Sequence, residues 1–94
     1  MELSELLAKL ADLAREAGLE VRELRAASDG QPSPASGVCR VRGETWVLLA
    51  ASDALEERVE VLARALKTHA ADFLESRYLP PAVRARLSKQ ADLG

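Results

Sequence analysis

Residues 37 to 51 read Gly37-Val-Cys-Arg-Val-Arg-Gly-Glu-Thr-Trp-Val-Leu-Leu-Ala-Ala51. β-Branched, aliphatic and aromatic residues on both sides of Gly43 are typical of two strands joined by a tight turn. This stretch therefore predicts a β-hairpin, and the other elements of the chain are expected to pack on its apolar face.

The sequence leaves two registers open for this hairpin. A three-residue loop of Arg42, Gly43 and Glu44 gives two separate faces: one with Cys39, Val41, Thr45, Val47 and Leu49, and the other with Arg40, Trp46 and Leu48. A two-residue turn at Arg42-Gly43 would instead place Cys39 opposite Trp46. We favour the three-residue loop because its aliphatic face is the more continuous.

Three helical segments flank the hairpin. Residues 2 to 17 have apolar side chains at helical spacing, and Gly18 suits the left-handed position after a helix end. A short extended segment follows around Val21. A second helix is predicted over 53 to 68, where Asp53 and Glu56 resemble a capping box. Pro80-Pro81 predicts the start of a short C-terminal helix.

These elements predict one α+β domain covering residues 1–94: an N-terminal helix, a small antiparallel sheet of about three strands, and two further helices. Residues 26 to 36 include Pro32 and Pro34, which lack ladder donors, and Asp29 and Gly30, which suit turns. We interpret this segment as a solvated connector.

Composition excludes several classes of protein. The formal net charge is −2, so general attraction to a phosphate backbone is absent and nucleic acid is an unfavoured partner. Cys39 and His69 are the only residues of their types. They predict no disulfide, no metal site and no cofactor, and Cys39 is interpreted as a small apolar strand residue. The N-terminus lacks a signal-peptide pattern, and no apolar run approaches the length of a membrane span. A soluble cytoplasmic protein is expected, and no small-molecule substrate is inferred.

The order of elements is similar to that of a known family. The segments Gly18-Leu-Glu-Val-Arg-Glu-Leu24, Ser36-Gly-Val-Cys-Arg-Val-Arg-Gly43, Thr45-Trp-Val-Leu-Leu49 and Ser52 to Leu66 resemble the N-terminal half of the ImmA/IrrE-type zincin metallopeptidases, over residues 3 to 69. In that family the helix carries a His-Glu-x-x-His motif that binds zinc. The corresponding positions here hold Arg64, Ala65 and Thr68, so the resemblance implies a related scaffold without zinc hydrolysis.

The sequence therefore predicts a non-catalytic protein that binds another protein, as a homodimer or in a small complex. The residues expected to carry the binding are, on the hairpin, Arg40, Arg42, Trp46 and Leu48, and, in the C-terminal segment, Tyr78 and Leu79. Three alternatives stay open. The C-terminal segment could cover the Trp46 face, the arginines Arg77, Arg84 and Arg86 could bind nucleic acid, or a partner chain could complete an enzyme site.

Overall fold

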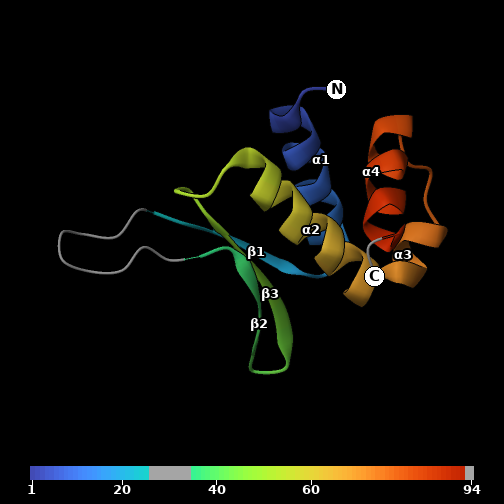
Figure 1. Cartoon of the computed structure of the whole chain (residues 1–94). Coiled ribbons are helices and arrows are strands. Elements are labelled where there is room, and N and C mark those ends of the chain that lie inside the picture. Colours follow the sequence, from blue (N-terminus) through green and yellow to red (C-terminus); the bar gives the residue numbers. More distant parts are fainter. Residues whose placement is uncertain (26–34, 93–94) are drawn as a thin grey trace.

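A three-stranded sheet carries helices on one of its faces in the computed structural model, which describes residues 1–25 and 35–92 (Figure 1). The central strand β3 (Glu44–Ala50) lies between β1 (Glu20–Leu24) and β2 (Gly37–Val41). The predicted α+β class and the order of its elements are confirmed. The predicted connector at 26 to 36 falls mostly outside the described residues.

The sheet is mixed, so the expectation of a fully antiparallel sheet was wrong. β2 pairs antiparallel with β3, as expected for a hairpin, but β1 pairs parallel with β3. The reason is that β3 inserts between β1 and β2, which run in opposite directions. β3 is the most buried of the three strands, with Val47, Leu49 and Ala50 almost fully covered, and a strand with such a sequence is stabilised most at the centre of a sheet.

The hairpin has a two-residue turn, which corrects the favoured three-residue loop. Val41 pairs with Glu44, and Cys39 pairs with Trp46. Arg42 and Gly43 occupy the turn with φ values of 51° and 83°. Positive φ at both central positions matches the right-handed twist of the strands, and this preference outweighed the continuity of the aliphatic face. Cys39 and Val41 therefore share a face with Trp46, while Arg40 shares the opposite face with Thr45.

The helices begin and end close to the predicted positions. Helix α1 (Leu3–Glu16) ends two residues before Gly18, as expected, and the φ of Gly18 is 92°. The N–H of Leu19 bonds to the carbonyl of Ala14 at 2.9 Å, which satisfies a carbonyl at the helix end. Helix α4 (Pro81–Asp92) begins at Pro81, as predicted. The short helix α3 (Ala71–Glu75) lies in a segment for which no helix was predicted.

The predicted capping box of the second helix is absent. Helix α2 (Leu55–His69) begins after Ala54, which makes no side-chain capping bond. The Asp53 carboxylate instead accepts a hydrogen bond from the Ser36 N–H at 2.9 Å, and the Ser36 hydroxyl accepts one from the Ala50 N–H at 2.8 Å. Asp53 therefore fastens the start of β2 to the β3–α2 connection.

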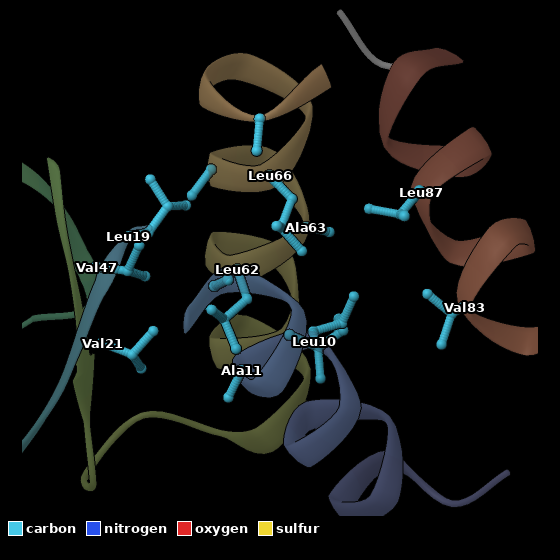
Figure 2. Close-up of a cluster of buried hydrophobic side chains, with 14 of the residues drawn as sticks. Leu10, Ala11, Leu19, Val21, Val47, Leu62, Ala63, Leu66, Val83 and Leu87 are labelled. Atoms are coloured by element: carbon cyan, nitrogen blue, oxygen red, sulfur yellow. The ribbon is translucent and has the colours of Figure 1, made fainter. Parts of the chain in front are cut away.

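The core lies between the sheet and the helices and continues outward to α4. α1 and α2 pack on the sheet, and α4 packs on α1 and α2 without contacting any described strand. Figure 2 shows this cluster, in which the sheet contributes Val21 and Val47, and α4 contributes Val83 and Leu87. The central position belongs to α2, whose Leu62 and Leu66 are fully buried. The helical layer therefore covers one face of the sheet and leaves the other face without a described helix.

Candidate interaction face

The face of the sheet turned away from the helices is called the outer face. Burial along β3 alternates: Thr45, Val47 and Leu49 are buried toward the helices, while Trp46 and Leu48 are only half-buried. The strand pairing then assigns the other members of the outer face, which are Glu20, Arg22, Leu24, Cys39, Val41 and Glu44. No helix in the described part of the chain lies on this face (Figure 1).

Trp46 lies at the centre of the outer face. It pairs with Cys39 of β2 on one side and with Glu20 of β1 on the other. The guanidinium carbon of Arg22 lies 4.8 Å from the centroid of the indole ring. Nε of Arg22 is also 3.1 Å from Oε1 of Glu20, so an acidic neighbour holds the guanidinium at the ring. These contacts make the Trp46 ring a flat and well-positioned anchor.

The indole N–H of Trp46 is buried and finds no hydrogen-bond acceptor among the described residues. Buried polar groups are usually hydrogen-bonded, and an unpaired one costs about 1–3 kcal/mol. The Trp46 side chain therefore combines a partly exposed apolar ring with an unsatisfied donor.

A hollow adjoins Trp46 at the hairpin end of the outer face. It is lined by Val41, Arg42, Glu44 and Trp46. Arg42 and Glu44 are exposed there and have opposite charges, as Arg22 and Glu20 have on the β1 side. The outer face thus has an apolar centre and a rim in which two acids and two bases balance.

The six residues predicted to bind a partner do not form one surface. Trp46 and Leu48 are on the outer face, and Arg42 borders the same hollow. Arg40 has the opposite orientation: its guanidinium donates hydrogen bonds to Oγ1 of Thr45 at 3.2 Å and to the carbonyl of Gly43 at 3.0 Å. Arg40 therefore stabilises the turn.

Tyr78 and Leu79 lie in the helical layer, away from the sheet. Tyr78 is 81% exposed, whereas Leu79 is 7% exposed and belongs to the core. Neither α3 nor α4 contacts a described strand, so these helices leave the outer face uncovered. The alternative in which the C-terminal segment covers that face is wrong for the described residues.

The sequence did not predict six of the outer-face residues as part of a binding surface, and the reason is clearest for Cys39, Val41 and Arg22. Cys39 and Val41 follow directly from a two-residue turn, so the Arg42-Gly43 pair was the signal that could have found them. Arg22 reaches Trp46 only because β1 lies beside β3. No local feature of the sequence indicates that pairing.

The residues considered for other chemistry are dispersed. Within residues 1–25 and 35–92, no three His, Cys, Asp or Glu side chains gather as a metal site would need. On α2, Arg64 and Thr68 are exposed and Ala65 is buried. The side chain of Arg86 is 10% exposed and pairs with Glu56, so it does not join Arg77 and Arg84 on the surface.

Asp53 is the acidic group whose environment most clearly changes its chemistry. Hydrogen bonds from Ser36, from its side chain and then its backbone N–H, hold the pKa of Asp53 below its ordinary value. The positive charge of Arg58 adds to this effect, and partial desolvation opposes it. The Asp53 carboxylate therefore has a structural role, because it holds the start of β2 to the β3–α2 connection.

Comparisons with protein-family profiles, with curated proteins and with solved structures return no match. None of the helices in the described ranges has the length and apolar character needed to cross a bilayer.

Proposed function

We propose that this protein is non-catalytic and acts by binding another protein through the outer face of its sheet, with a second copy of the chain as the first partner. One observation carries the proposal: Trp46 stands among Val41, Leu48 and Cys39 on a sheet face that no described helix covers. Apolar aromatic centres surrounded by polar rims are typical of protein interfaces.

The charges of the rim support a second copy as the partner. A two-fold interface places the same patch against itself, so each base must be able to meet an acid of the other copy. Glu20 and Glu44 balance Arg22 and Arg42 on this face. A rim of one sign would repel its own copy, whereas this rim can pair with it.

The non-catalytic part of the proposal is supported by α2. Arg64, Ala65 and Thr68 occupy the positions that carry the zinc-binding motif in the family that the sequence resembles. None of these side chains is a usual zinc ligand. A cytoplasmic location belongs to the same proposal, and it is supported by a lone cysteine in the sequence.

The test is a mass measurement by light scattering over a concentration series, with wild type, Trp46→Ala and Tyr78→Ala. Tyr78→Ala is the matched control because it removes an exposed aromatic side chain away from the sheet. Wild type and Tyr78→Ala should reach the dimer mass together, and folded Trp46→Ala should need at least a roughly tenfold higher concentration. A wild-type protein that stays monomeric, or a Trp46→Ala protein that dimerises equally well, contradicts the proposal.

A further inference from the structure

A second feature of the molecule lies in the helical layer, away from the sheet. The end of α2, the short α3, the segment that follows it and α4 surround an open cleft of about 340 Å³. This volume is at the lower end of the range for small-molecule sites. The cleft shares no residue with the outer face, so it is independent of the proposed function.

Three leucine side chains form an apolar part of the lining at the floor of the cleft. The three residues are Leu74 of α3, Leu79 of the segment between α3 and α4, and Leu87 of α4. Each of these side chains is less than a tenth exposed. They come from three separate segments and belong to the main core. The floor is therefore a fixed apolar surface, because moving any of these side chains would disturb the core packing.

The rim of the cleft is predominantly positive. Lys67, Arg77 and Arg84 line it together with a single acid, Glu75. Arg77 already has partners: its Nη2 is 2.6 Å from Oε1 of Glu16, and its guanidinium lies over the Phe73 ring. Lys67 and Arg84 make no ion pair or side-chain hydrogen bond with the described residues. Two cationic groups from different helices thus border one apolar floor without compensating partners.

We propose that this cleft binds a small amphiphilic carboxylate, with an aliphatic chain on Leu74, Leu79 and Leu87 and the carboxylate at Lys67 and Arg84. The chemistry of the lining selects this class. An apolar floor rewards an aliphatic chain in proportion to the area that it buries. A guanidinium and an ammonium group at the rim favour an anion over a neutral head group.

The lining argues against a nucleic-acid strand in the same place. Single-stranded nucleic acid is held by aromatic stacking together with backbone charge. No aromatic side chain lines this cleft in the described structure. An aliphatic anion fits both the floor and the rim.

The proposal is tested by methyl NMR titration of the whole protein with octanoate, below the concentration at which octanoate self-associates. Saturable shifts are expected in the methyl groups of Leu74 and Leu87. Hexanoate, which is two methylenes shorter, should bind roughly tenfold more weakly. Octanol, which lacks the charge, should also bind roughly tenfold more weakly than octanoate. Equal affinities for octanoate and octanol, or no saturable shifts, overturn the proposal.

Two variants locate the site. Arg84→Gln should weaken octanoate binding roughly fivefold, as expected for a partly solvated ion pair. Arg64→Gln is the matched control on an exposed position outside the cleft and should leave the affinity unchanged. Ala71→Leu places an apolar side chain at an exposed position on the cleft wall and should block the ligand. If Arg84→Gln and Arg64→Gln act alike, or if Ala71→Leu binds normally, the ligand lies elsewhere and the proposal fails.

Discussion

Arg22 of β1 lies over the indole ring of Trp46 on the neighbouring strand β3, with its guanidinium carbon 4.8 Å from the ring centroid. The two residues are two positions out of register, since Trp46 pairs with Glu20 and Arg22 pairs with Leu48. The contact therefore depends on the parallel pairing of β1 with β3. It connects the topology of the sheet to the surface on which the proposed function depends.

Removing Arg22 should expose the ring without unfolding the domain. We expect Arg22→Ala to lower the free energy of unfolding by about 0.5–1 kcal/mol, the usual size of an exposed cation–π contact. The emission of Trp46, the only tryptophan in the chain, should shift to longer wavelength as water reaches the ring. Denaturant unfolding and fluorescence measure both effects. Arg25→Ala, at an exposed position after β1, is the control, and an identical response of the two variants would contradict the contact.

The turn residue Arg42 offers a stabilising substitution. Its φ of 51° lies in the left-handed region, where asparagine is accommodated better than arginine. Arg42→Asn should raise the free energy of unfolding by about 0.5 kcal/mol, in the lower range of such backbone effects. Gly43→Ala, at φ 83°, should lower it by about 1 kcal/mol. Thermal or denaturant unfolding that gave the opposite order for the two variants would argue against the two-residue turn.

The ion pair between α2 and α4 contains a mostly buried charge, that of Arg86. Nη2 of Arg86 is 2.5 Å from Oε1 of Glu56, yet Nε and Nη2 of Arg86 are buried without an aligned hydrogen bond. Glu56→Gln leaves the guanidinium uncompensated and should cost about 1–3 kcal/mol, reduced by the partial exposure of Glu56. Adding Arg86→Met removes the buried charge and should recover part of that loss. A double-mutant cycle in denaturant checks this, and additive losses would contradict the pairing.

The lowered pKa of Asp53 should make the free energy of unfolding depend on pH. Its folded pKa lies below the ordinary value of 3.8, so its contribution is complete above that value and is lost as the pH falls through the folded pKa. Asp53→Asn should therefore flatten the fall in unfolding free energy between about pH 4 and pH 2. Asp12→Asn, which removes a carboxylate in a solvated ion pair with Arg15, is the control. A wild-type slope in Asp53→Asn would mean that another carboxylate causes the acid sensitivity.

The parts of the fold that the sequence predicted are those with strong local signals. Gly18 and Pro81 mark helix ends through their backbone chemistry, and the structure confirms both positions. The hairpin was predicted for a similar reason, but its register depended on two competing preferences. The geometry of a two-residue turn at Arg42-Gly43 outweighed the continuity of the aliphatic face. Cys39 therefore lies on the same face as Trp46.

The remaining features depend on contacts between distant segments, which have no local signature. The parallel pairing of β1 with β3 brings Arg22 to Trp46. The sequence predicted Asp53 as a helix cap, but its carboxylate instead accepts a hydrogen bond from Ser36, which is distant in sequence. Tyr78 and Leu79 were both expected to bind a partner, while the structure exposes the first and buries the second. Packing of α3 and α4 on α2 decides these positions.

An NMR dilution series shows whether the outer face binds a second copy of the chain. The methyl groups of Val41 and Leu48 and the indole N–H of Trp46 report on the outer face, and the ring of Tyr78 reports on the helical layer. If two copies associate through this face, the shifts of the three outer-face groups depend on concentration and those of Tyr78 stay constant. Shifts that do not change with concentration, or that appear at Tyr78 instead, would contradict association through this face.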